Sequence, residues 1–189
     1  MIEVWYLDES GFAPTLPTGY TWARRRIRAL VRDEAPQGRR LNVLGALAAG
    51  GAARGLVWTA PTGRLDSGVF LEFVRQQVAR LPAHLPADYR RATPCVIVLD
   101  NSSVHRSKQV QALRPELERV GVYWYYLPAY SPELNRIEEL WRHLKYEELP
   151  QRSYRTLTEL RAAVTEALAK HAISLPTPLH STTNLPEAA

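Results

Sequence analysis

Three acidic side chains lie in segments whose composition suits chemistry on phosphate esters. Asp8 and Asp100 each close an apolar run, and Glu138 lies near the start of an amphipathic segment. Carboxylates brought close together repel one another unless cations lie between them, and Mg2+ prefers oxygen ligands of this kind. The pattern therefore predicts a two-metal Mg2+ site, with Mn2+ as a substitute, in which these three residues are metal ligands and catalytic residues.

Each acid also has a structural explanation when it is taken alone. A single Asp after a strand commonly caps a turn, and a Glu in the first turn of a helix is favoured by the helix dipole. Glu138 lies about 100° from Ile137 around a helical wheel, at the edge of an apolar stripe, where it can lean into a site. Glu133 and Glu139 remain rival candidates for the third ligand. The joint arrangement of the three acids is what favours a functional site.

The elements that must position these acids alternate between strands and helices. Apolar and aromatic runs predict strands at residues 2–7, 41–49, 54–60, 94–99 and 122–127. Helical spacing predicts helices at residues 67–81 and 107–120, from residue 132 with Ser131 as N-cap, and from residue 156. This order predicts an α/β fold with a mixed five-stranded sheet flanked by helices. Asp8 and Asp100 would lie at the carboxyl ends of strands, where such sheets collect functional groups.

Composition indicates a single soluble domain with a basic surface. The chain has 189 residues and a formal net charge of +5. No run of about 18 apolar residues and no signal peptide is present, so we expect no membrane association and a cytoplasmic location. Cys95, the single cysteine, lies in an apolar run and is expected to be a buried thiol.

Arginine supplies most of the positive charge and makes DNA a candidate partner. The planar guanidinium pairs well with phosphate oxygens. The candidate DNA-binding residues are Arg24, Arg25, Arg26, Arg28, Arg39 and Arg40 near the first hairpin, with Asn101 and His105 after the second acid. The alternatives are a solvated basic face for the arginines and a helix-capping role for Asn101 and His105. Alternating aromatic residues around Trp124 are interpreted as packing residues rather than as a base-stacking surface.

The three acidic segments resemble a known family. LDESGF, VLDNSSVH and LPAYSPELNRIEELWRHLK are similar to the catalytic domain of IS630-group transposases, within the Tc1/mariner superfamily of DDE enzymes. The resemblance covers about residues 3–148. It implies an RNase H-like fold with Asp8 on the first strand, Asp100 after the fourth and Glu138 on a later helix. It also implies Mg2+-dependent DNA strand cleavage and strand transfer during insertion-sequence transposition, in association with the bacterial nucleoid.

Two departures from the family pattern bear on partners and domain organisation. Arg136 follows Asn135 where the family usually has proline, and seven residues precede Asp8 where family members carry helix-turn-helix segments. We therefore expect an RNase H-like DDE catalytic domain at residues 1–171, a flexible C-terminal tail at residues 172–189 and no helix-turn-helix region. The expected partners are transposon-end and target DNA, a second copy in a homodimer, and a separate N-terminal DNA-binding polypeptide.

Two other functions fit the same acids. One is a non-catalytic DNA-binding or assembly remnant of a transposase, and the other is an RNase H-like nuclease acting on RNA–DNA hybrids. A phosphatase that uses Asp8 as its nucleophile is disfavoured. Such an enzyme needs a second acid two residues later, and that position is Ser10.

Overall fold

The computed structural model describes residues 2–15, 24–27, 40–50, 55–149 and 153–172. Its strands form one sheet in the order β3-β2-β1-β4-β5. The strands are β1 (Glu3–Phe12), β2 (Leu41–Gly50), β3 (Gly55–Thr59), β4 (Cys95–Leu99) and β5 (Val122–Tyr126). β2 is antiparallel to β1 and β3, whereas β4 is parallel to β1 and β5. The predicted mixed five-stranded sheet is confirmed.

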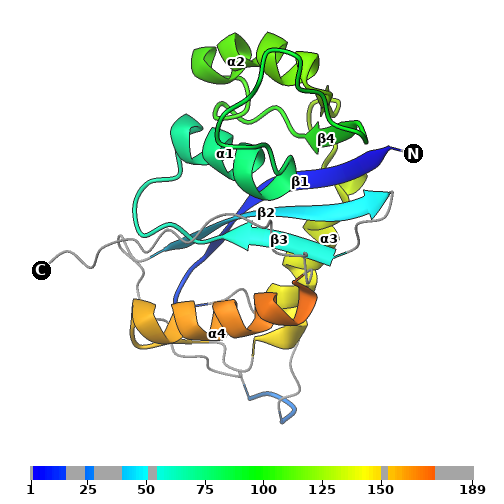
Figure 1. Ribbon diagram of the computed structural model, residues 1–189. Coiled ribbons are helices and arrows are strands. Elements are labelled where there is room, and N and C mark those ends of the chain that lie inside the picture. The colour runs from blue at the N-terminus through cyan, green and yellow to red at the C-terminus, as the bar shows by residue number, and fades with distance from the viewer. Residues whose placement is uncertain (1, 16–23, 28–39, 51–54, 150–152, 173–189) are drawn as a thin grey trace, which may run out of the picture.

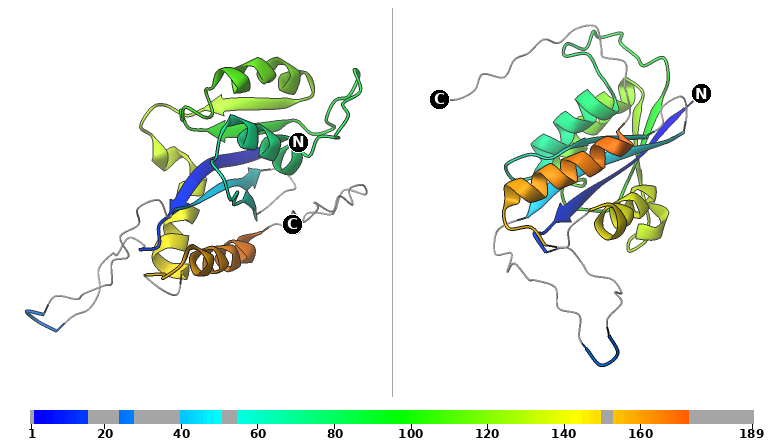
Figure 2. Two further views of the ribbon diagram at one scale, coloured as in Figure 1. Left: turned by 90° about the vertical axis from the view of Figure 1, so that its left-hand side faces the viewer. Right: turned by 90° about the horizontal axis from the view of Figure 1, so that it is seen from below.

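Helices cover both faces of this sheet (Figures 1 and 2). They are α1 (Ser67–Phe73) with the π-helical turn η1 (Val74–Val78), α2 (Lys108–Arg119), the 3-10 turn η2 (Pro132–Leu134), α3 (Arg136–His143) with the π-helical turn η3 (Leu144–Glu148), and α4 (Leu157–His171). Figure 1 shows α1 and α2 on one side of the sheet and α4 on the other. None of the helices described is long and apolar enough to cross a membrane.

Two buried clusters hold the layers together, one on each face of the sheet. Trp5 and Leu7 of β1 belong to the cluster beneath α1 and α2, together with Ile97 and Leu99 of β4. Phe12 belongs to the second cluster, which contains residues of α3 and α4. Because successive side chains of a strand point to opposite faces, a central strand covered on both faces reads as an almost continuous apolar run.

Polar side chains start the helices where the sequence indicates. The N-cap side chains of Asp66, Ser107 and Thr156 accept hydrogen bonds from backbone N–H groups in the first turns of α1, α2 and α4. Gly121, which follows the C-cap residue Val120 of α2, has a φ of 90°, a conformation that commonly ends helices at glycine. These local signals explain why the predicted boundaries of α1, α2 and α4 lie close to the observed starts.

Two predicted boundaries are wrong. β1 does not end before Asp8 but continues to Phe12, because its antiparallel pairing with β2 extends from Val4 to Phe12. The third helix does not begin at residue 132: Ser131 forms no side-chain cap, η2 ends at Leu134, and α3 begins at Arg136. In the predicted tail, Ala172 forms a bridge with Leu56, and residues 173–189 lie outside the described residues.

Candidate active site

Asp8 lies where β1 extends past the end of its parallel neighbour. Pairing with β4 stops at Tyr6, whereas pairing with β2 continues and places Asp8 opposite Gly45. The carboxyl group is buried, with 8% of the residue exposed. Burial, and then the charges of Glu138 and Asp100, raise the pKa of Asp8 to about 7. Asp8 is therefore close enough to both other acids to interact with their charges.

Asp100 follows the last residue of β4 and is held by two hydrogen bonds. Its Oδ1 accepts from the backbone N of Ser102 at 3.0 Å and from Nδ1 of His105 at 2.7 Å. The hydrogen bond from His105 is the largest cause of a lowered pKa at Asp100. The group is therefore ionised and fixed in orientation.

Glu138 lies in the first turn of α3, which approaches the sheet closely at Gly45. A Cβ atom at Gly45 would lie 2.6 Å from Cη2 of Trp141 and 3.3 Å from Cδ1 of Ile137. The absence of a side chain at the residue paired with Asp8 thus lets α3 pack against β2. Asn135, which is 3% exposed, donates from Nδ2 to the carbonyl oxygen of Leu7 at 3.4 Å and ties the start of α3 to β1.

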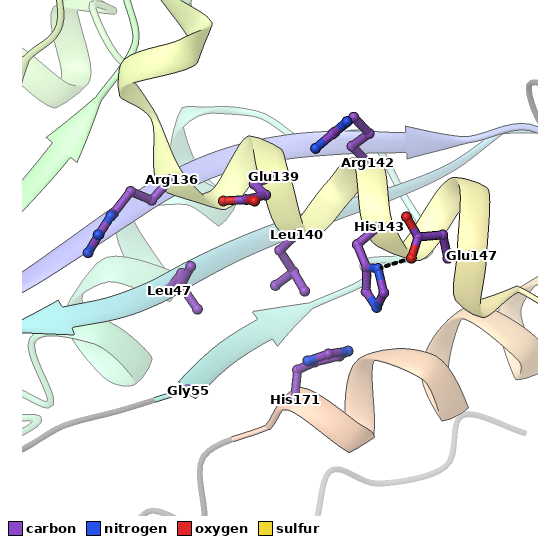
Figure 3. Close-up of a pocket in the computed structure, with 9 residues that line it drawn as sticks. All are labelled: Leu47, Gly55, Arg136, Glu139, Leu140, Arg142, His143, Glu147 and His171. Carbon is purple, nitrogen blue, oxygen red and sulfur yellow. Dashed lines mark ion pairs between the residues drawn. The ribbon is translucent and has the colours of Figure 1, made fainter. Parts of the chain in front are cut away.

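A cavity of about 420 Å³ has both Asp100 and Glu138 in its wall. Residues of the loop after β5, including Tyr130, also line this cavity. Glu139 lies instead on a second cavity of about 390 Å³, with Leu47, His143 and His171 (Figure 3). Of the rival candidates, Glu133 is exposed in η2. Asp100 and Glu138 thus share one cavity, the charges of both raise the pKa of Asp8, and Glu139 lies elsewhere.

The candidate DNA-binding residues fall into different surroundings. Arg24, Arg25 and Arg26 are exposed in a turn. Arg40 lies over β1, since a Cβ atom at Gly11 would meet its guanidinium group. Arg28 and Arg39 lie outside the described residues.

The two polar residues after Asp100 are engaged within the protein. Asn101 donates from Nδ2 to the carbonyl oxygen of Leu127 at 2.7 Å and accepts from Nε of Arg106 at 2.7 Å. His105 is fully buried, so it is not placed to touch DNA, and it does not cap α2 because Ser107 does. Its ring contacts Asp100 instead.

Two charged residues at the site were missed by the sequence interpretation. Lys145 is half-buried in η3, and burial lowers the pKa of its ammonium group. The charges of Glu138 and Asp8 act to raise this pKa, and the charge of Arg40 acts to lower it. Lys145 follows Glu138 by seven positions, two helical turns on the same face, a spacing that could have identified it. Glu9 lies on the other face of β1, 3.9 Å from Nε2 of His105, and burial raises its pKa.

The donor set suits a hard divalent cation. Within the described ranges, no group of three or more His, Cys, Asp or Glu side chains is already arranged to hold a metal ion. Asp8 nevertheless has a raised pKa partly because Glu138 and Asp100 are near. A proton on one member is how clustered carboxylates relieve repulsion when a cation is absent. The chemistry of the three side chains therefore fits a divalent cation.

Comparison with solved structures supports the fold. The Mos1 strand transfer complex matches with a TM-score of 0.54 at 15% identity, over 88% of this chain and 47% of that chain. The Mos1 paired-end complex with the left transposon end matches with a TM-score of 0.51 at 14% identity, over 88% of this chain and 47% of that chain. The intasome of simian T-cell lymphotropic virus in complex with PP2A regulatory subunit B56 gamma matches with a TM-score of 0.51 at 13% identity, over 97% of this chain and 60% of that chain. These catalytic domains are RNase H-like, as expected for this chain.

Sequence comparison identifies the family. The insertion element IS630 uncharacterized 39 kDa protein of Shigella sonnei is 38% identical over 60 residues, which are 32% of this chain and 17% of that protein. The chain therefore matches only a small part of this relative and about half of the Mos1 chains. The model of the DDE superfamily endonuclease family matches residues 3–161, which include all three acidic segments. The resemblance to IS630-group transposases is thus confirmed, and the chain belongs to the DDE superfamily endonuclease family.

Proposed function

We propose that this domain catalyses Mg2+-dependent DNA strand cleavage and strand transfer in insertion-sequence transposition. Asp8, Asp100 and Glu138 are its proposed catalytic residues and metal ligands. The observation that carries the proposal is the convergence of three carboxylates from β1, the end of β4 and α3, with the pKa of Asp8 raised to about 7 by burial and by its acidic neighbours. Membership of the endonuclease family supports this reaction class.

The protein's own groups have distinct tasks in this reaction. Divalent cations, when bound, would activate the attacking oxygen and offset charge on the leaving oxygen. Asp100 is held ionised by His105, so it needs no reorientation before it binds a cation. Lys145 places a positive charge beside Glu138 and Asp8, where it would bind a phosphate oxygen of the DNA backbone. The cavity of about 420 Å³ leaves room for the scissile phosphodiester.

The proposed partner is DNA, bound largely through its backbone. Arg24, Arg25, Arg26 and Arg40 supply positive charge for phosphates, and this kind of binding carries no sequence information by itself. Asn101 faces the same cavity as Asp100 and would contact the strand there. Recognition of element ends would then come from a second copy of the chain or a separate N-terminal DNA-binding polypeptide. The protein would work at the nucleoid in the bacterial cytoplasm.

Nicking of supercoiled plasmid DNA in Mg2+ and in Mn2+ tests this function. Asp8→Asn, Asp100→Asn and Glu138→Gln should each reduce cleavage below detection while the chain remains folded. Glu139→Gln is the matched control, because it removes the neighbouring carboxylate of the same helix from a different cavity. Retained cleavage by any of the three variants would show that the substituted residue is not a catalytic residue.

The same assay distinguishes the other candidate functions. DNA binding without cleavage by the wild-type chain in either metal would indicate a non-catalytic remnant. Cleavage confined to RNA–DNA hybrids would indicate an RNase H-like nuclease. Cleavage of duplex DNA with a free 3′-hydroxyl product supports the transposase proposal.

A further inference from the structure

Adjacent residues of β1 serve the two faces of the sheet. Asp8 points toward α3 and Glu138, and Glu9 therefore points to the opposite face, beneath α1 and α2. On that face Oε1 of Glu9 lies 3.9 Å from Nε2 of His105. The other ring nitrogen, Nδ1, lies 2.7 Å from Oδ1 of Asp100. One imidazole ring thus spans the distance between Glu9 and a proposed metal ligand.

The His105 ring is enclosed on its other sides. The residue is fully buried, and its ring centroid lies 4.8 Å from that of Phe70. Its backbone carbonyl accepts a hydrogen bond from the hydroxyl of Tyr126 at 2.8 Å. Backbone and ring are therefore both restrained, and the remaining freedom of the ring is rotation about the Cβ–Cγ bond, which would put carbon atoms where Nδ1 and Nε2 now lie.

Glu9 and His105 each present one buried polar atom that lacks another partner. Among the residues that the structure describes, neither Oε1 of Glu9 nor Nε2 of His105 forms a hydrogen bond. Their separation is too long for a hydrogen bond but short enough for strong electrostatic interaction in a buried place. Leaving both atoms unpaired is costly, so each is the best available partner of the other.

We infer that Glu9 is a positioning residue that acts on Asp100 through His105. A proton between Oε1 of Glu9 and Nε2 allows the carboxyl group to hold that nitrogen, which fixes the ring so that Nδ1–H donates to Asp100 and orients that carboxylate for a divalent cation. This inference rests on the proposed function, because it assigns Asp100 to cation binding. Strand β1 would then position two proposed metal ligands. It carries Asp8 itself, and Glu9, the next residue, orients Asp100 through His105.

A double-mutant cycle with Mn2+ binding as readout tests the inference. Glu9→Gln should lower the affinity for Mn2+ in the absence of DNA, by roughly 10–100-fold as for other partners of metal ligands. His105→Asn should lose less affinity than His105→Gln, because the shorter amide can donate to Asp100 from near the position of Nδ1. Combined with His105→Ala, Glu9→Gln should have no further effect, since the connecting ring is gone. Calorimetry gives the affinities, and denaturant unfolding shows whether each variant is folded.

Glu116→Gln is the matched control, since it removes a carboxylate paired with Arg75 away from the cavity and should leave Mn2+ affinity unchanged. Additive effects of Glu9→Gln and His105→Ala, or unchanged affinity in folded Glu9→Gln, would overturn the inference. Additive losses would instead indicate that Glu9 binds the cation itself. Wild-type protein that neither binds Mn2+ nor cleaves DNA would overturn the proposed function as well. In that case, 15N NMR of the His105 ring in wild type and Glu9→Gln separately decides whether Glu9 fixes the ring.

Discussion

Asp8 and Asp100 carry the same functional group in opposite surroundings. Asp8 is buried among like charges, which raises its pKa, whereas Asp100 accepts hydrogen bonds from His105 and Ser102, which lower its pKa. One group thus holds a proton at mildly acidic pH while the other stays ionised. A site of this kind binds cations best above the pKa of Asp8, because bound carboxylates must be deprotonated.

Asp8→Asn is expected to stabilise the metal-free protein at neutral to alkaline pH. The pKa of Asp8 is about 7 in the folded protein against an ordinary value of 3.8, so the folded state holds an extra proton between these values. The free energy of unfolding should therefore fall as pH rises from about 4 to about 7 and then level off. At about pH 8 the variant should be more stable by roughly 1–3 kcal/mol.

Denaturant unfolding in EDTA at about pH 5 and about pH 8 measures this difference. The difference in the free energy of unfolding between Asp8→Asn and wild type should be larger at the higher pH. Glu139→Gln serves as control and should show no such difference. A variant less stable than wild type at about pH 8 would contradict the assigned protonation of Asp8.

Lys145→Gln is expected to weaken DNA binding and cleavage. The ammonium group lies near Glu138 and Asp8, and a charged hydrogen bond to phosphate contributes about 1.5–3 kcal/mol. The loss should therefore be roughly 10–100-fold in DNA affinity. Fluorescence anisotropy with labelled duplex DNA measures it, and Lys170→Gln, at the exposed end of α4, is the control. Equal effects of the two substitutions would show that Lys145 contributes only general positive charge.

At the scale of elements, the site depends on how β1, β2 and α3 fit together. β1 continues along β2 after its pairing with β4 has ended, and Asp8 lies in this extension. α3 begins at Arg136, in the first helical position, where proline is also tolerated, so the family's usual proline is not needed for this helix to start. The close approach of α3 at Gly45 then sets the position of Glu138.

Gly45→Ala should displace α3 and impair cleavage more than folding. The added methyl group would meet the ring of Trp141, and overpacking of this kind costs roughly 1–3 kcal/mol. Because Glu138 lies on the same helix, its carboxylate would move from Asp8. Denaturant unfolding and plasmid nicking measure the two effects.

Gly63→Ala is the matched control for that substitution, since nothing lies within 4 Å of a Cβ atom there. It should leave both stability and cleavage close to wild type. Full cleavage by Gly45→Ala would show that the contact between α3 and β2 does not determine the position of Glu138.

Across the whole molecule, β1 links two features. Asp8 of the candidate active site lies toward its C-terminal end, and Glu3, its first residue, belongs to a structural ion-pair cluster. Glu3, which is largely buried, binds Arg80 and Arg91 at 2.8 Å each. Arg91 also donates to the carbonyl oxygens of Ala79 and Thr93. The cluster therefore fastens the end of η1 and the segment before β4 to the first strand.

Glu3→Gln should lower stability without changing the chemistry of the folded protein. Removing one member of a largely buried ion pair costs roughly 3–5 kcal/mol, because the remaining charges are left unpaired. Denaturant unfolding measures the loss, and cleavage should be unchanged per folded molecule. Glu72→Gln, which alters an exposed contact with Gln76, is the control and should change stability little. A loss of cleavage in folded Glu3→Gln would indicate coupling along β1.

The kinds and order of the elements and the three acidic segments can be predicted from local sequence patterns alone. Apolar runs, helical spacing and capping residues are local signals, and they predicted the strands, α1, α2 and α4. The Ser-Pro-Glu-Leu-Asn and Ile-Glu pattern around Glu138 likewise needs no tertiary information to be recognised.

Which residues accompany those acids depends on tertiary contacts. The length of β1 beyond Asp8 depends on its register with β2, and that pairing includes Gly11, although glycine is uncommon inside strands. The burial of His105, the contact of Glu9 with it and the place of Lys145 beside Glu138 depend on elements far apart in the chain. Register and helix docking are set by side-chain packing across the sheet, and no local pattern specifies that packing.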